Sequence, residues 1–570
     1  MILSPLIHIH VLEIKMNLEV LKQTLASLDI SPDKIDDERS AKAFRILFAI
    51  IEIQNEEIEA LKAENQKLRD EINLLKGEQT KPKIRGSKEN GDISSENERR
   101  QRNSRKDRES NSRKDKIEIH HTETCRVDRS TLPEDAVSKG YRPVVIRDII
   151  VKPWNTKYLI EGLYSPSEGK TYSGKLPNDV KGEFGSGLRT LILTLYHVAN
   201  VSEPKIHEFL ENVGVWISKA TISRILTEDN DLFHEEKSEI FRSGLNSTTY
   251  QQIDDTSARV NGNNWYTQII CNPYYAAYFT VPYKNRETIL DILLCGNEKT
   301  YCFNEEAFEL MEMFNIPRLW IRKLSFFKGK TYTDEEIRRK IDNVFSPNGY
   351  KNTKLRVLEA CSIAAYHRMT NIPVVTTLLS DDAPQFSKLT FQHAHCWIHD
   401  GRNYKKLRPI VPYHQEKLKA FLDRYWDYYG KLCEFKIKPD AEVAEKLDAE
   451  FEHLFSTKTG YEQLDERISK TKEKKESLLM VLTMPAIPLH NNTAELAARA
   501  KVRKRDVSLQ TVTDKGTKAN DTFMTIVQTA KKLGVSAYDY IFDRVSNTFA
   551  MLSLAQLIGE KSGLFGTSCG

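Results

Sequence analysis

A polar, highly charged stretch divides this chain of 570 residues into parts that must fold separately. Between Glu78 and Lys116, 13 Lys and Arg residues stand against 8 Asp and Glu residues, a net charge of +5, and Ile84 and Ile93 are the aliphatic residues. A segment this poor in apolar side chains cannot bury a core, so we expect it to be disordered. Non-specific contact with DNA phosphates is one reading of its charge, and a solvated spacer is the other.

The composition is that of a globular protein without membrane spans. Hydrophobic residues make up 40% and charged residues 29%, and no window approaches 18 uninterrupted apolar residues. The apolar opening MILSPLIHIHVLEIK lacks a basic start and a cleavage site, so we read it as neither signal nor anchor. The eight cysteines contain no Cys-x-x-Cys pair, which favours reduced thiols and a cytoplasmic protein.

A heptad pattern before the linker predicts a coiled coil over residues 41–77. Phe44, Ile51 and Ile58 occupy a positions, while Leu61 and Leu68 occupy d positions. Asn65, also at an a position, can pair with its own copy and fix the register of a parallel homodimer. The alternative is an amphipathic helix that packs on its own chain.

Two small regions follow the linker. Residues 119–190 carry short β-type runs such as YRPVVIRDIIV, which predict a strand-rich unit. In residues 191–245, a helix from about Ser202, a turn at Gly214 and a second helix capped by Ser218 have helix-turn-helix spacing. A second helix of this kind enters the major groove of double-stranded DNA, although many helical hairpins bind no DNA. Its candidate DNA-binding residues are Lys219, Thr221, Ser223 and Arg224.

Three strand-like runs from Thr248 onward predict an antiparallel meander, and a later apolar strand over 374–379 ends at Asp381. Asp254 lies on the first run, and Glu495 lies on a helix that begins near Asn492. Three carboxylates from separate elements are enough to hold the two metal ions of phosphodiester chemistry. Asp-Asp doublets are also common in turns, and Glu495 stands at the capping-box offset from Asn492.

Only one member of each doublet, Asp254-Asp255 and Asp381-Asp382, can face a shared pocket, and periodicity does not say which. Beyond Glu495 the same helix is dense in basic residues, which suggests that a DNA backbone passes there, unless this is an ordinary solvated face. These basic residues are Arg499, Lys501, Arg503, Lys504 and Arg505.

At these residues the sequence resembles the transposases of the bacterial insertion sequence 66 family, a branch of the DDE transposases. IDDT resembles the family's Ala-Asp-Glu-Thr and selects Asp254; LLSDD resembles Val-Ser-Asp-Gly and selects Asp381. HNNTAELAAR is similar to Asp-Asn-Asn-Ala-Ala-Glu-Arg-Ala-Ile-Arg and assigns Glu495. HAHCWIHDGRNYKKL resembles the family's Cys-Trp-Ala-His-Ala-Arg-Arg-Lys stretch, which adds Arg402 as a DNA-binding candidate.

The resemblance implies a DNA transposase that cleaves transposon ends and transfers the strands to target DNA. It implies two Mg²⁺ or Mn²⁺ ions on Asp254, Asp381 and Glu495, terminal inverted repeats and target DNA as partners, and possible helper proteins of the element. The family's zinc ribbon is represented here by His120, His121 and Cys125 alone, so we expect no structural zinc. Cys396 and His399 are expected to form a buried structural pair.

The predicted fold is mixed α+β: a ribonuclease-H-like catalytic domain with helical insertions, preceded by a coiled coil and a small helix-turn-helix region. The alternatives are a catalytically inactive, transposase-derived DNA-binding protein and a coiled-coil scaffold. The predicted parts are an N-terminal segment (1–40), the coiled coil (41–77), the linker (78–118), the strand-rich unit (119–190), the helix-turn-helix region (191–245), the catalytic domain (246–535, with insertions at about 296–373 and 415–488) and a helical tail (536–570).

Overall fold

The computed structural model describes residues 30–75, 119–128, 140–177, 182–345 and 349–563. The predicted linker and most of the N-terminal segment lie outside these residues. The chain divides into two compact units, of which the smaller comprises residues 94–177 and 203–222 and the larger the rest. None of the described helices is long and apolar enough to cross a membrane.

The predicted coiled-coil segment forms one long helix, α2 (Glu38–Leu75), after the short 3₁₀ helix η1 (Pro32–Lys34). The first half of α2 packs on its own chain, because Phe48 is buried against Val411 and Tyr413. The buried carboxylate of Glu52 accepts hydrogen bonds from the backbone N–H groups of Ile410 and Val411, at 2.9–3.0 Å. The first half of α2 is therefore an amphipathic helix that packs on its own chain, which was the alternative to a coiled coil.

The second half of α2 keeps an exposed apolar stripe. Leu61 and Leu68 are each 51% exposed, and Ile72 and Leu75 are exposed as well. The Asn65 side chain donates to the carbonyl of Leu61 within its own helix, at 3.0 Å. A homodimer through this stripe stays a prediction.

The smaller unit contains less β structure than the sequence predicts. Its described residues contain one antiparallel hairpin, β1 (Gly162–Ser165) with β2 (Lys170–Ser173). Residues 140–161, which include the run YRPVVIRDIIV, have no regular structure. The prediction of a strand there is wrong, because β propensity alone supplies no neighbouring strand to pair with. The unit also holds α5 (Glu203–Asn212) and the start of α6 (Lys219–Thr227).

A five-stranded mixed sheet forms the centre of the larger unit, in the order β5-β4-β3-β8-β9. The predicted meander is confirmed as β3 (Gln251–Val260), β4 (Asn263–Cys271) and β5 (Ala276–Val281), which pair antiparallel. The later strands β8 (Thr377–Ser380) and β9 (Gln392–His395) extend the sheet in parallel from β3. This topology is consistent with the predicted ribonuclease-H-like domain.

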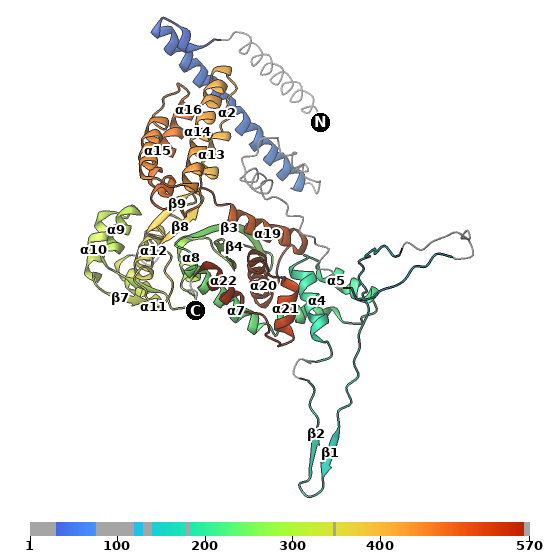
Figure 1. Cartoon of the computed structure of the whole chain (residues 1–570). Coiled ribbons are helices and arrows are strands. Elements are labelled where there is room, and N and C mark those ends of the chain that lie inside the picture. The colour runs from blue at the N-terminus through green and yellow to red at the C-terminus, as the bar shows by residue number, and fades with distance from the viewer. Residues whose placement is uncertain (1–29, 76–118, 129–139, 178–181, 346–348, 564–570) are drawn as a thin grey trace. The chain divides into compact units, whose positions relative to one another are not determined.

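Helices before and after the sheet cover it (Figure 1). The helix α19 (Asn492–Ser508) packs on β3 and β4, and α20 (Asp514–Leu533) packs along β5. Thr525 and Thr529 of α20 accept hydrogen bonds from the backbone N–H groups of β5, which satisfies the free edge of that strand. Four more helices pack around α20: α4 (Ser186–His197), α7 (Asp231–Asn246), α21 (Ala537–Val545) and α22 (Leu554–Ser562).

Two mostly helical segments lie where the sequence predicts insertions, one between strands of the sheet and one between the last strand and α19. The first lies between β5 and β8: α8 (Arg286–Leu293), β6 (Thr300–Cys302), α9 (Glu305–Met313), α10 (Arg318–Leu324), η3 (Ser325–Phe327), β7 (Thr331–Thr333), α11 (Asp334–Val344) and α12 (Lys351–Tyr366). The second follows α13 (Trp397–Lys405): α14 (Pro412–Ile437), α15 (Ala441–Leu454), α16 (Glu462–Lys472), α17 (Lys475–Leu478) and α18 (Met480–Thr483).

The second insertion, α14–α18, has a core of its own. Aromatic and aliphatic side chains of α14, α15 and α16 pack around the fully buried indole of Trp397. The indole N–H of Trp397 donates to the carbonyl of Leu478 at 2.9 Å, and the Tyr425 hydroxyl donates to the carbonyl of Trp397 at 3.0 Å. The helix α13 is therefore held against this insertion.

Candidate active site

The register of the sheet distinguishes the two aspartates of the first doublet. Asp254 lies opposite Ile269 of β4, which in turn lies opposite Tyr278 of β5. Directly paired residues share one face of a sheet, and Ile269 and Tyr278 pack against Ala494 and Ala497 of α19. Asp254 thus lies on the face that α19 covers, the same helix that carries Glu495.

Asp255 lies on the opposite face, paired with Gln268. Its carboxylate accepts a hydrogen bond from the side-chain amide of Gln385 at 2.9 Å and lies 3.8 Å from the ammonium of Lys284. These partners occupy the carboxylate of Asp255, whereas the carboxylate of Asp254 accepts a hydrogen bond from the backbone N–H of Asp255 at 2.8 Å.

Asp381 follows the last residue of β8, where parallel strands place polar side chains at one edge of the sheet. The hydroxyl of Ser380 donates to the carbonyl of Asp381 at 2.6 Å and lies 2.7 Å from Nε2 of His393. Burial lowers the pKa of His393 to about 3, so its ring is neutral. Because the one hydroxyl proton of Ser380 goes to the carbonyl of Asp381, Nε2 of His393 is the donor to Ser380. These two hydrogen bonds fix the main chain at Asp381, and no sequence pattern predicted them.

Glu495 lies in the first turn of α19 but does not close a capping box. The N-cap of α19 is Asn491, whose side chain makes no capping hydrogen bond. The Glu495 carboxylate instead faces α13, where both terminal nitrogens of Arg402 lie 3.4 Å from its oxygens. Arg499, one turn further along α19, is 3.7 Å away.

His399 also faces Glu495, with Nε2 3.7 Å from Oε1 of the carboxylate. Burial lowers its pKa, against the opposing effect of Glu495. Nε2 lies 3.3 Å from Nη1 of Arg402, and because a guanidinium only donates, the neutral ring accepts there. His399 therefore belongs to the surroundings of Glu495.

Cys396 is buried, as predicted, but its partner is not the ring of His399. Its sulfur accepts a hydrogen bond from the backbone N–H of Asn491 at 3.2 Å, and burial raises its pKa to about 11, so the thiol stays neutral. The side-chain amide of Asn491 donates to the carbonyl of Ile253 at 2.7 Å. Asn491 thereby ties the start of α19 to β3 beside Asp254.

The three carboxylates influence one another electrostatically. Burial raises the pKa of Asp254 to about 7; the N–H of Asp255 opposes this, and the charges of Asp381, Asp255 and Glu495 add to it. Burial also raises the pKa of Asp255, against the lowering by Lys284. Asp254 is thus a buried carboxylate near other negative charges, and a bound cation would stabilise its ionised form.

The chemistry of the donors fits a divalent cation, because Mg²⁺ and Mn²⁺ prefer carboxylate oxygens. Within the described ranges, however, no three or more His, Cys, Asp or Glu side chains are gathered closely enough to hold a metal ion. Arg402 and Arg499 neutralise part of the charge of Glu495. Metal binding at Asp254, Asp381 and Glu495 therefore stays a prediction.

Two of the basic residues predicted on α19 are not available to DNA. Lys501 is buried and pairs with Asp521 at 3.1 Å, and buried Lys504 donates to the carbonyl of Tyr196. The structure therefore does not support DNA contacts for these two, because α19 buries this side against the core. Arg505 donates to Ser257, whereas Arg503 is exposed.

The predicted helix-turn-helix elements are present locally. Gly214 has a positive φ of 82° in the turn, and the hydroxyl of Ser218 accepts from the backbone N–H of Thr221 at 3.1 Å. At the start of α6, Lys219 and Arg224 are exposed, while Thr221 and Ser223 are half-buried. Contact between these residues and DNA stays a prediction. His120, His121 and Cys125 are exposed.

Comparison with known proteins identifies the family. The sequence profile described as "Transposase IS66 family" matches residues 365–519, a range that includes Asp381 and Glu495. The uncharacterized protein y4jO of Sinorhizobium fredii (strain NBRC 101917 / NGR234) is 31% identical over 329 residues, which cover 57% of this chain and 100% of that protein. The chain belongs to the IS66 transposase family. In this IS66-family chain, Asp254 lies outside the profile match, so its role rests on the IDDT motif and on the geometry of β3.

Proposed function

We propose that this IS66-family chain cuts DNA at the ends of a mobile element and joins the freed ends to target DNA, with Asp254, Asp381 and Glu495 as the catalytic carboxylates. The observation that carries the proposal is that the register of β3 puts Asp254 on the face of the sheet covered by α19, the helix that carries Glu495. Burial raises the pKa of Asp254, and the charges of Asp381 and Glu495 add to the increase. Carboxylates that lie far apart in the sequence are within electrostatic reach of one another. Such perturbed groups cluster at functional sites.

The three carboxylates would hold two divalent ions. When bound, these ions would activate the attacking water or 3′-hydroxyl and stabilise the leaving oxygen. In this assignment Asp254 must be ionised. Arg402 and His399 orient the carboxylate of Glu495, and they are positioning residues because they act through it.

DNA would reach the site along α19. Arg499 has a side chain that is 43% exposed, and Arg503 is exposed on the same helix, so both can contact phosphates. Exposed Lys219 and Arg224 of α6 would contact the terminal inverted repeats. The exposed apolar stripe of α2 would bring two copies of the chain together. A requirement for helper proteins of the element stays a prediction.

The adjacent aspartates provide a matched test. Asp254→Asn and Asp255→Asn each remove one charge from β3, on opposite faces of the sheet. With a supercoiled plasmid that carries the element's ends, and with Mg²⁺, we expect Asp254→Asn to abolish nicking and Asp255→Asn to keep most of it. Binding of labelled end DNA should be unchanged in both variants.

Nicking by Asp254→Asn at the wild-type rate would refute the assignment. A wild-type chain that binds the ends but never nicks them would instead support the alternative, an inactive DNA-binding protein descended from a transposase.

A further inference from the structure

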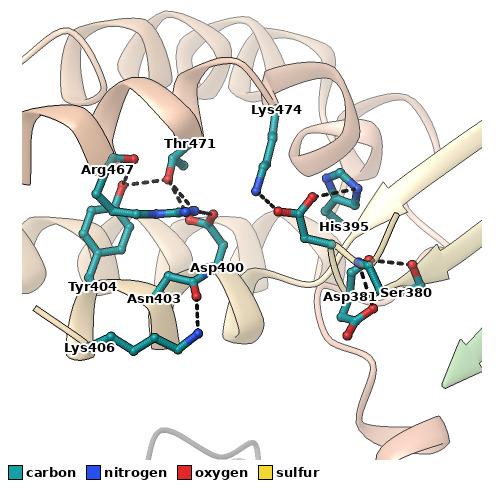
Figure 2. A network of polar contacts seen from close by, with 12 residues as sticks. Ser380, Asp381, His395, Asp400, Asn403, Tyr404, Lys406, Arg467, Thr471 and Lys474 are labelled. Carbon is teal, nitrogen blue, oxygen red and sulfur yellow. Dashed lines mark hydrogen bonds and ion pairs between the residues drawn. The ribbon is translucent and has the colours of Figure 1, made fainter. Parts of the chain in front are cut away.

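We infer that the insertion α14–α18 positions the catalytic carboxylates, through Lys474 at the Asp381 turn and through Arg467 at α13. This inference rests on the proposed function, and it assigns a role to an insertion that the family match leaves undefined. Lys474 and Arg467 lie at different points of the insertion. Their contacts end at the two elements next to the carboxylates, the turn after β8 and the helix α13 (Figure 2).

The first contact reaches the turn after β8. Lys474, between α16 and α17, forms an ion pair with Asp382, the residue after Asp381. Nε2 of His395 lies 3.9 Å from the other oxygen of Asp382. Figure 2 shows Lys474 extending toward this turn, beside Asp381 and Ser380. The backbone of the turn is thereby tethered from outside the sheet.

The second contact holds α13. Buried Asp400 forms an ion pair with Arg467 of α16. It also accepts hydrogen bonds from the hydroxyl of Thr471 at 2.9 Å and from that of Tyr425 at 3.3 Å. A buried carboxylate with three donors from α14 and α16 fixes the rotation of its helix.

The rotation of α13 matters because its other side faces Glu495. His399 and Arg402, on either side of Asp400 in the sequence, lie 3.7 Å and 3.4 Å from the Glu495 carboxylate. A change in how α13 packs on the insertion would move both side chains relative to α19. The insertion is thus linked to Glu495 by this route and to Asp381 by Lys474.

A comparison with Lys475, the next residue, shows that the contact of Lys474 is not one that holds the insertion together. Lys475 forms ion pairs with Asp448 and Glu452, both within the insertion. The two lysines are similarly exposed, 19% and 26%, but Lys474 leaves the insertion to reach Asp382. A part-exposed pair of this kind contributes little to stability, so its main effect is on the geometry of the turn.

Lys474→Met and Lys475→Met in the full chain test the inference. We expect Lys474→Met to weaken Mn²⁺ binding, measured by electron paramagnetic resonance without DNA, by about 5-fold, and to raise the Mg²⁺ concentration for half-maximal nicking similarly. Lys475→Met should leave both unchanged. Both variants should melt within a few degrees of the wild type.

Two further variants show whether the pair itself is responsible. Asp382→Asn should weaken Mn²⁺ binding as much as Lys474→Met does, and the double variant should be no worse than either. The exchange Asp382→Lys with Lys474→Asp should restore part of the affinity.

Equal Mn²⁺ affinities for Lys474→Met and Lys475→Met would overturn the inference while leaving the proposed function intact. A wild-type chain that binds Mn²⁺ but does not nick would count against the proposed function alone. If the wild type binds no Mn²⁺, both fail.

Discussion

Gly244, near the end of α7, allows the closest approach between that helix and the sheet region. A methyl group added at its Cα would lie 2.4 Å from Cδ1, 2.5 Å from Cγ and 2.6 Å from Cε1 of Tyr275. Tyr275 is fully buried, and its hydroxyl donates to Oε1 of Gln251 at 3.0 Å. The ring therefore cannot move away without breaking a hydrogen bond to the first residue of β3.

The size of the effect of Gly244→Ala follows from two opposing terms. Alanine stabilises a helix by up to about 1 kcal/mol relative to glycine. Overpacking a dense core costs about 1–3 kcal/mol, and three ring carbons at these distances place Gly244→Ala at the upper end. We expect a net loss of about 2 kcal/mol in the free energy of unfolding.

Gly430, in the middle of α14, is the matched control, because an added methyl group there meets nothing within 4 Å. Gly430→Ala should stabilise its helix by about 0.5–1 kcal/mol. Amide hydrogen exchange, resolved by peptide, measures both changes, since it reports the sheet and the insertion separately. Faster exchange is expected in α7 and β3 of Gly244→Ala, and slower exchange in α14 of Gly430→Ala. Protection of β3 at the wild-type level in Gly244→Ala would refute the packing argument.

Two further changes test other parts of the chain. Replacing Leu61 and Leu68, each 51% exposed on α2, with glutamate should convert a dimer to monomer in analytical ultracentrifugation; an unchanged dimer mass would place the interface elsewhere. Burial raises the pKa of Glu236 from 4.5 to about 7, against the lowering by Arg544, so the folded state keeps a proton that the unfolded state releases. Its contribution to stability should fall by up to about 3 kcal/mol as pH rises from 4.5 to 7. The free energy of unfolding of Glu236→Gln, measured with urea, should therefore depend less on pH than that of the wild type. The same pH dependence in both proteins would contradict the raised pKa.

The elements that carry the site were predictable from local patterns. Alternating and apolar runs predicted β3, β4 and β5, and the short apolar run before Asp381 predicted β8. The start of α19 near Asn492 was also predicted correctly. Motif resemblance then selected Asp254, Asp381 and Glu495, and the register of β3 puts Asp254 on the face of α19.

The surroundings of the carboxylates were not predictable. Basic residues on α19 looked alike in the sequence, yet Lys501 and Lys504 are buried and Arg503 is exposed. Which side of a helix is covered depends on neighbours that lie far away in the chain. Likewise, nothing near Lys474 or Lys475 in the sequence distinguishes the lysine that reaches Asp382.

The sequence by itself determined the strands β3, β4, β5 and β8, the start of α19 and the family, because side-chain periodicity and short motifs are local properties. The tertiary structure decided which aspartate faces α19, that Glu495 meets Arg402 and His399, and that half of α2 packs on its own chain. These contacts join residues that are distant in sequence, so they depend on the register of the sheet and on how the helices pack.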